Sequence, residues 1–170
     1  MSEPSPAKTP SESMTEMVQV VLPNDANPLG YLLGGTAMHL IDVAAAIAGH
    51  RHARSPLVTA AVDGLQFLHP IKIGDLIILK ARVTAAWTTS LEVEVEVFSE
   101  ETLTGRRRMT SLAYLTFVVV DRGSQRLPIP RLIVESDDER RREAEAQARR
   151  AERLRARHAL ELRLGPIPHQ

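Results

Sequence analysis

The sequence predicts an α+β fold: one long central helix wrapped by a curved antiparallel sheet of about five strands, followed by a charged C-terminal helix. Three observations predict it. One short and four long segments have the composition of strands, and an alanine-rich apolar segment separates the first of them from the other four. After residue 134 the composition changes abruptly to arginine, glutamate and alanine. A sheet with one apolar face needs a covering layer, which the apolar helix can supply.

The strand segments are set apart by their β-branched residues and by the turn residues between them. Residues 17–22 form the short strand, and the long ones cover 57–71, 75–87, 90–98 and 108–121. In the third long segment glutamates alternate with apolar residues (LEVEVEV, 91–97), which predicts a sheet with one solvent-facing side. Because the connections are short, we expect neighbouring strands to pair as hairpins.

The central helix is expected over residues 36–52 (TAMHLIDVAAAIAGHRH). This segment has no proline and carries apolar residues almost all the way round, so the helix should be buried on most faces. A sheet curled around it would leave one helix face for a second subunit to cover. Gly34 and Gly35 precede the segment and allow a ligand to approach the first free NH groups of the helix.

The chain divides into three parts. Residues 1–13, rich in proline, serine and glutamate, are expected to be a disordered leader, and residues 14–132 the folded domain. Residues 133–170 form a charged helical extension, with Ser136 and three acidic residues suiting a helix start near residue 135 and an end near 164. A solvated extension and a helix that contributes to a binding site remain equal alternatives for this part.

The overall composition excludes several classes of protein. Lysine plus arginine equal aspartate plus glutamate at 21 each, so no net field draws the chain to nucleic acid or to an anionic membrane. Cysteine is absent, which excludes disulfides and thiolate catalysis and fits a reducing compartment. The N-terminal residues do not resemble a signal peptide, and no apolar stretch reaches about 20 residues. We therefore expect a cytoplasmic protein.

Asp42 is the candidate for chemistry, because it is a lone carboxylate in an apolar patch of the central helix. Burying a charge without a partner is costly. One interpretation places Asp42 in solvent or pairs it with His39 or His50. The other places it in a cleft, where it acts as a general base or as a nucleophile. The residue pattern does not distinguish between these two interpretations.

His50 and His52 point to different helix faces, so we expect no metal site.

An ordered series of motifs resembles the acyl-CoA thioesterases of the hotdog superfamily, including broad-range bacterial and vertebrate cytosolic enzymes. The series begins with NPLGYLLGGTAMHLID (27–42) and continues with AAAIA (44–48), RH (51–52), VTAAVD (58–63), FLHPI (67–71), GD (74–75), TS (89–90) and TFV (116–118). It covers roughly residues 15–132. Leu33 and the His39–Leu40 pair depart from the commoner pattern. These positions bear on acyl chain length, which the sequence leaves open.

The resemblance implies a hotdog fold and hydrolysis of acyl-CoA to a free fatty acid and coenzyme A, without a cofactor. It implies that Asn27 of one subunit and Asp42 of the other form the catalytic pair, which makes a dimer the minimum active unit and a hexamer of three dimers the expected assembly. The thioester carbonyl would face the helix start at Gly34 and Gly35. The coenzyme-binding residues would be Ala60, Ala61, Val62, Thr89, Ser90, Leu91 and, from the C-terminal helix, Arg149.

Two other functions compete with this hypothesis. A hotdog hydroxyacyl dehydratase would need a helix histidine and an acidic residue to share the acid and base work, and no such segment is evident. A noncatalytic acyl-CoA sensor or RNA-associated module could use the arginine-rich tail. The balanced charge and the aromatic content of 4% argue against nucleic acid. General-base and mixed-anhydride routes, and regulation by nucleotides, remain open.

Overall fold

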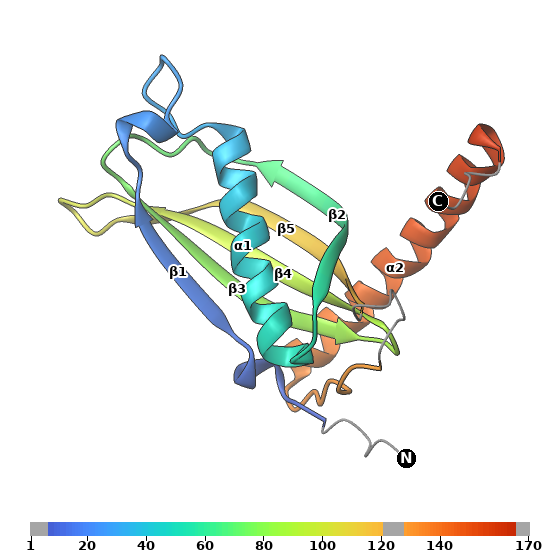
Figure 1. Cartoon of the computed structure of the whole chain (residues 1–170). Helices are drawn as coiled ribbons and strands as arrows, with labels where there is room; N and C mark the ends of the chain where they lie inside the picture. Colours follow the sequence, from blue (N-terminus) through green and yellow to red (C-terminus); the bar gives the residue numbers. More distant parts are fainter. Residues whose placement is uncertain (1–6, 121–127, 166–170) are drawn as a thin grey trace.

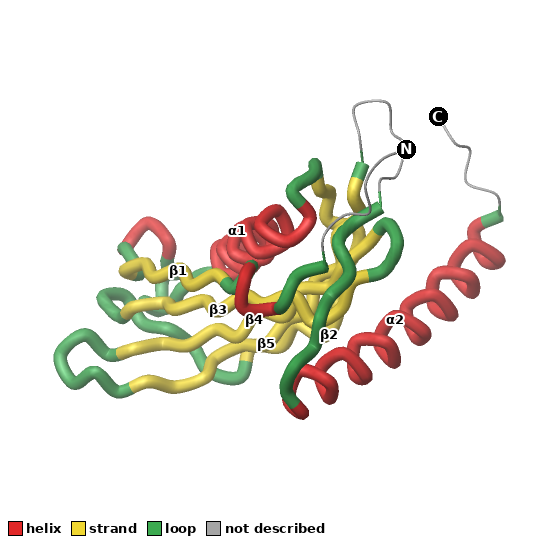
Figure 2. The backbone as a smooth tube through the Cα atoms, turned by 90° about the horizontal axis from the view of Figure 1, so that it is seen from below, coloured by secondary structure: helices red, strands yellow, loops and turns green. Residues whose placement is uncertain are grey.

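The computed structural model describes residues 7–120 and 128–165. Five strands form one antiparallel sheet: β1 (Thr15–Val20), β2 (Leu57–Phe67), β3 (Leu76–Ala86), β4 (Ser90–Glu100) and β5 (Arg107–Val119). Helix α1 (Gly34–Ala53) lies against one face of the curved sheet and helix α2 (Asp137–Leu164) against the other (Figures 1 and 2). Short 3-10 helices, η1 (Pro10–Glu12) and η2 (Pro23–Asp25), flank β1. This confirms the predicted hotdog arrangement.

The strand order is β1-β3-β4-β5-β2. The expected hairpins form between β3 and β4 and between β4 and β5, where the loops are short. The prediction that all neighbouring strands pair is wrong for β2 and β3. The segment between them carries the chain from β2, at one edge of the sheet, to β3, which lies between β1 and β4, and β2 pairs with β5 instead. Strand β2 is therefore an edge strand.

The core lies between α1 and the concave face of the sheet. Helix α1 contributes mainly alanines, of which Ala44, Ala45 and Ala48 have no exposed surface. Such small side chains let the helix approach the strands closely, and at Gly49 an added Cβ would lie 2.7 Å from Leu57 Cδ1. The sheet supplies larger residues, including Val93, Leu115 and Phe117. The periodicity of the sequence thus identifies the core correctly.

The expectation of a solvent-facing side on β4 is wrong. Glu92 and Glu94 are 0% and 2% exposed, because α2 covers that face of the sheet. Arg149 binds Glu92, and Arg142 binds Glu94. Alternating glutamates indicate a polar face, but arginines from a distant helix can cover such a face as well as water can. The alternative of a purely solvated C-terminal extension is excluded by the same contacts.

The expectation of a disordered leader over residues 1–13 is wrong for residues 7–13. Residues 1–6 lie outside the described residues, whereas residues 7–13 are ordered and include the short helix η1, with Pro10 and Ser13 buried and Ser11 and Glu12 exposed. Lys8 NH donates to the Arg131 carbonyl at 2.9 Å, and Lys8 Nζ donates to the carbonyls of Arg51 and His52 at the end of α1. These contacts tie the start of the chain to the segment that leads into α2. The last residue of the strand expected over 108–121, residue 121, lies outside the described ranges.

Candidate active site

Asn27 is held in a tight loop between η2 and α1. Its side-chain Oδ1 accepts hydrogen bonds from the NH groups of Leu29 (3.0 Å) and Tyr31 (3.2 Å), and its backbone NH donates to the Tyr31 carbonyl (2.8 Å). Gly30 completes the loop with a φ of +82°, a left-handed conformation that glycine adopts without strain. Because the loop uses the oxygen of the side chain, the Nδ2 amide is left available to donate to a ligand.

The loop leads directly into the start of α1. Leu33 is the N-cap residue and its side chain makes no capping bond, while the first intrahelical bond runs from Ala37 NH to the Leu33 carbonyl. The NH groups of Gly34 and Gly35 are therefore free at the exposed, positive end of a 20-residue helix. Such a helix start can stabilise a developing negative charge on a carbonyl oxygen.

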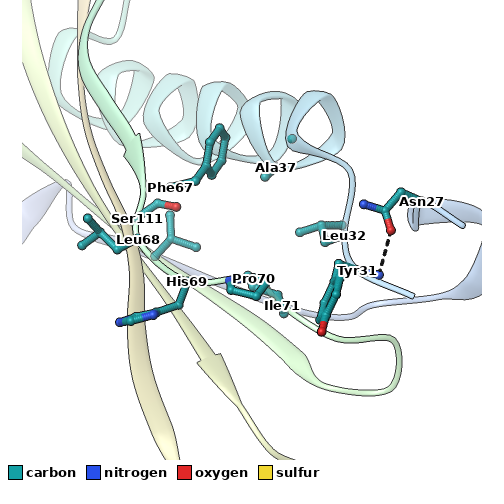
Figure 3. Close-up of a pocket in the computed structure, with 12 residues that line it drawn as sticks. Asn27, Tyr31, Leu32, Ala37, Phe67, Leu68, His69, Pro70, Ile71 and Ser111 are labelled. Atoms are coloured by element: carbon teal, nitrogen blue, oxygen red, sulfur yellow. Dashed lines mark hydrogen bonds between the residues drawn. The ribbon is translucent and has the colours of Figure 1, made fainter. Parts of the chain in front are cut away.

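A cavity of about 310 Å³ opens beside these groups and is called the Asn27 cavity here (Figure 3). Its wall is mostly apolar: Leu32, Ala37, Phe67, Leu68, Pro70, Ile71 and Val97, with Asn27, Tyr31, Gly34, His69 and Ser111 as further lining residues. It runs from the Asn27 loop and the start of α1 toward β4 and β5. An elongated apolar group attached to a reacting carbonyl would fit this combination.

Asp42 lies two turns further along α1. It is half-buried, and its Oδ1 accepts a 2.8 Å hydrogen bond from the hydroxyl of Thr59 on β2. Asp42 and Thr59 line a second, separate hollow with Met38, Ile41 and Val62, called the Asp42 cavity here. The alternatives of a pairing with His39 or His50 are thus wrong, since the partner is a hydroxyl across the helix–strand interface.

Asn27 and Asp42 do not meet within one chain. They line different cavities that share no residue, and eight residues of helix at 1.5 Å each separate Gly34 from Asp42 by about 12 Å. Exposed apolar side chains border both cavities: Met38 and Val62 at the Asp42 cavity are 48% and 47% exposed, and Phe67 and Leu68 at the Asn27 cavity are 52% exposed each. The two residues of the predicted pair therefore lie in separate hollows on a partly apolar surface.

A third concave region, the α2 groove, lies between the sheet and the second half of α2. The sheet side contains Ala60, Ala61, Thr89, Ser90, Thr116 and Val118, and the helix side Arg150, Arg153, Leu154, Ala156, Arg157 and Leu160. Four of the coenzyme-binding residues implied by the resemblance therefore lie together. Three arginines face them across the groove, which makes it suitable for a phosphorylated ligand.

Three other predicted residues lie elsewhere. Arg149 faces the sheet instead of the α2 groove, with two hydrogen bonds to Glu92. Leu91 has no exposed surface, because its side chain packs in the core. Val62 belongs to the Asp42 cavity. Arg150, the next residue along α2, does line the groove, because one helix position turns a side chain by about 100°.

Sequence reasoning missed Thr59 and the three groove arginines. Thr59 is the one hydroxyl residue in an otherwise apolar run at the start of β2 (LVTAAV, 57–62), which was a usable signal. The strand is irregular here, since Thr59 pairs with Phe117 and Ala61 with Thr116, leaving Ala60 as an extra residue. This bulge lets Thr59 face α1 while Ala61 faces the α2 groove.

The described residues contain no group of three or more histidine or acidic side chains placed to hold a metal ion. No helix among the described ranges is long and apolar enough to cross a membrane.

Comparison with known proteins agrees with this geometry. A model of the thioesterase superfamily matches residues 29–105. The chain is 38% identical over 128 residues to an uncharacterised acyl-CoA thioester hydrolase of Bacillus subtilis, covering 75% of this chain and 74% of that protein. It is 32% identical over 143 residues to the human cytosolic acyl coenzyme A thioester hydrolase, covering 83% of this chain but only 38% of the longer human protein.

Solved structures show the same fold. An acyl-CoA hydrolase from Staphylococcus aureus in complex with butyryl coenzyme A, coenzyme A and coenzyme A disulfide has a TM-score of 0.83 and 34% identity, covering 94% of this chain and all of that one. A hexameric acyl-CoA thioesterase has a TM-score of 0.85 and 35% identity, covering 89% of this chain and 97% of that one. By its sequence and its fold, this chain belongs to the thioesterase superfamily, among the acyl-CoA thioester hydrolases.

Proposed function

We infer that this protein is an acyl-CoA thioesterase, which hydrolyses acyl-CoA to a free fatty acid and coenzyme A. The observation that carries the function is the Asn27 loop, because Asn27 lines the same apolar cavity as Gly34 at the start of α1, and both the Asn27 amide and the first NH groups of this helix are free to donate. These donors would hold the thioester carbonyl, and their hydrogen bonds would strengthen as its oxygen becomes negative.

We propose that the carboxylate comes from a second copy of the chain. Asp42 of one subunit and Asn27 of the other then form one site, in which Asp42 activates a water molecule or attacks the carbonyl carbon itself. The water oxygen ends in the fatty acid, the carbon–sulfur bond breaks, and the sulfur leaves as the thiol of coenzyme A. Thr59 fixes the orientation of the Asp42 carboxylate through its hydrogen bond.

The surface of the protomer supports the dimer. Strand β2 is an 11-residue edge strand, and Val58, Val62 and Phe67 on it are each about half exposed. Exposed apolar edge strands favour association, and a two-fold axis would pair β2 with its copy and cover α1. A hexamer of three dimers is proposed by analogy with the hexameric relative.

The two halves of the substrate would bind in different places. The acyl chain fits the Asn27 cavity, whose 310 Å³ correspond to about ten groups of the size of a water molecule or a methylene. The phosphorylated nucleotide of coenzyme A fits the α2 groove, where Arg150, Arg153 and Arg157 supply positive charge. The backbone on the sheet side of the groove would make most of the remaining contacts, at Ala60, Ala61, Thr89 and Ser90.

We propose a cytoplasmic role in fatty acid metabolism, in keeping with the human cytosolic relative.

The test is release of free thiol from acyl-CoA, followed with a thiol reagent over a panel of acyl chain lengths. The wild-type protein is expected to release coenzyme A, and the folded Asp42→Ala variant is expected to lose that activity. A dehydratase would change the acyl group without releasing thiol, and an acyl-CoA sensor would bind substrate and leave it intact. Either result with the wild-type protein would refute the proposed hydrolysis.

A further inference from the structure

Helix α2 is attached to the sheet by charged contacts. Arg142, Arg149 and Arg153 each contact a carboxylate of the sheet, namely Glu94, Glu92 and Asp63. Among the described residues of α2 only Ala146 is buried. Apolar contacts can be kept when a helix moves slightly along its axis, whereas an ion pair with hydrogen bonds is formed only at one position of the helix. The position of α2 along the sheet is therefore set by these arginines.

The Glu92–Arg149 pair is the most constrained of these contacts. Glu92 has no exposed surface and receives two hydrogen bonds from the guanidinium, Nη2 to Oε1 at 2.8 Å and Nε to Oε2 at 3.1 Å. The Thr84 hydroxyl donates a third, at 2.7 Å, to Oε1. The same guanidinium lies 3.5 Å from the centre of the Tyr114 ring. A bidentate hydrogen bond together with stacking on the ring fixes both the position and the orientation of the guanidinium plane.

This pair adjoins the α2 groove on both of its walls. On the sheet, Glu92 lies opposite Thr116 in the β4–β5 ladder and follows Ser90 by two residues, and both of these line the groove. On the helix, Arg149 directly precedes Arg150, whose guanidinium stacks over the Trp87 ring at 4.9 Å. The C-terminal end of α2 projects beyond the sheet (Figure 1), and every helix residue of the groove follows Arg149 in the chain. A shift at Arg149 would therefore be passed to every helix residue of the groove.

We propose that Glu92 and Arg149 are positioning residues that set the coenzyme-binding site without touching the coenzyme. The proposal rests on the proposed function, which assigns the nucleotide to the α2 groove. The pair holds α2 in the one register that places Arg150 and Arg153 opposite Ser90 and Ala61. Arg149, expected from the sequence to bind coenzyme A itself, acts on coenzyme binding through the helix.

The experiment compares two substrates in the full-length protein. Acyl-CoA reaches the α2 groove, whereas the same acyl thioester of pantetheine lacks the phosphorylated nucleotide. In Glu92→Gln and Arg149→Ala, KM for acyl-CoA should rise about tenfold or more, because hydrogen bonds to a charged group are lost. Both kcat and the constants for the pantetheine thioester should stay unchanged. Arg149→Lys keeps the charge but loses the bidentate geometry, so its KM for acyl-CoA should lie between those of the wild type and Arg149→Ala.

A binding measurement makes the test independent of catalysis. Calorimetry with adenosine 3′,5′-bisphosphate should show binding to the wild-type protein and weaker binding to both variants by the same factor as KM. Arg141→Ala is the matched control, since Arg141 pairs with Asp138 and Glu145 on the exposed side of α2 and should change neither quantity. If a single variant fails to fold, the double variant Glu92→Gln, Arg149→Gln removes both charges together.

The outcomes separate the two proposals. Wild-type protein that binds the bisphosphate, with weakened binding in the variants, supports the positioning role even if no acyl-CoA is hydrolysed, and the proposed function alone then fails. Unchanged nucleotide binding in the variants, equal losses with both thioesters, or no bisphosphate binding by the wild-type protein would overturn the positioning role.

Discussion

The hydroxyl of Thr59 donates a 2.8 Å hydrogen bond to Oδ1 of Asp42, joining the edge strand β2 to the middle of helix α1. This bond leaves Oδ2 of the carboxylate free to act on water or on a thioester. It also links the geometry of the proposed site to the bulge at Ala60, which sets the direction of the Thr59 side chain. Strand β2 therefore contributes to the proposed site as well as to the proposed dimer surface.

Loss of this hydroxyl should slow the reaction without unfolding the protein. Thr59→Val keeps the shape of the side chain, so the thermal midpoint should change little, while kcat should fall about tenfold because the Asp42 carboxylate is no longer held in one orientation. Thr59→Ser retains the donor and should keep most of the activity. Equal turnover in the valine and serine variants would show that the bond has no role in catalysis.

Substitutions of Asn27 can separate the structure of its loop from its chemistry. Asn27→Asp keeps an oxygen that accepts from the NH groups of Leu29 and Tyr31, but it removes the Nδ2 donor. We expect the aspartate variant to fold like the wild type and to lose roughly two orders of magnitude in kcat, as for one oxyanion donor. Circular dichroism and steady-state kinetics on the same preparation check both parts. A change in KM alone would make Asn27 a binding residue.

Mixing two inactive variants tests whether the site is shared. Asn27→Ala and Asp42→Ala proteins, after subunit exchange, should form mixed dimers with one intact site and one doubly damaged site. Activity should recover toward about half of the wild-type value in those mixed dimers. Native mass spectrometry confirms the exchange. If exchanged dimers stay inactive, each subunit supplies its own complete pair.

Filling the Asn27 cavity should change chain-length preference. Ala37 lines this cavity on α1, and Ala37→Leu would project three more carbon atoms into it. We expect kcat/KM to fall for long acyl chains and to stay close to the wild-type value for acetyl-CoA. The ratio between long and short substrates, measured in one protein, corrects for any loss of folded enzyme. A parallel loss for every chain length would argue that the acyl group lies elsewhere.

Stability should depend on pH through His52. This ring has no exposed surface, its Nε2 lies 2.9 Å from the Pro130 carbonyl, and burial lowers the pKa of the imidazole below its ordinary value of 6.5. As the pH falls below 6.5, the unfolded chain takes up a proton that the folded chain does not, so His52 destabilises the folded state progressively. Lys8 next to it adds to the lowering of the pKa.

The His52→Gln variant, which keeps a hydrogen-bond donor but does not titrate, isolates this contribution. Between pH 6.5 and about 5 its free energy of unfolding should fall less steeply than that of the wild type. Urea unfolding at a series of pH values measures both slopes. Burial also raises the pKa of the Glu94 carboxyl above its ordinary value of 4.5. Above pH 4.5 this shift makes the free energy of unfolding fall as the pH rises, which is opposite to the effect of His52. The Glu94 contribution is the same in both proteins and does not affect the comparison. Identical slopes in the two proteins would show that His52 does not titrate with folding.

The sequence by itself determined the layered fold, the bounds of the main elements to within a few residues, and the family. Helix and strand periodicities are local, so the apolar α1 and the alternating β4 could be recognised without knowing their neighbours. The motif series identified Asn27 and Asp42 as candidates, and both lie on cavities. Their roles stay predictions.

Only the tertiary structure decided what covers the glutamates of β4, where Arg149 points and which residue holds Asp42. Each depends on partners far apart in the chain: Glu92 meets Arg149 57 residues later, and Glu94 meets Arg142 48 residues later. An alternating glutamate predicts a polar face equally well whether water or an arginine lies opposite. The Thr59–Asp42 bond likewise needs the bulge and the approach of β2 to α1, because hydrogen bonds form between groups that the fold brings within about 3 Å, at any separation along the chain.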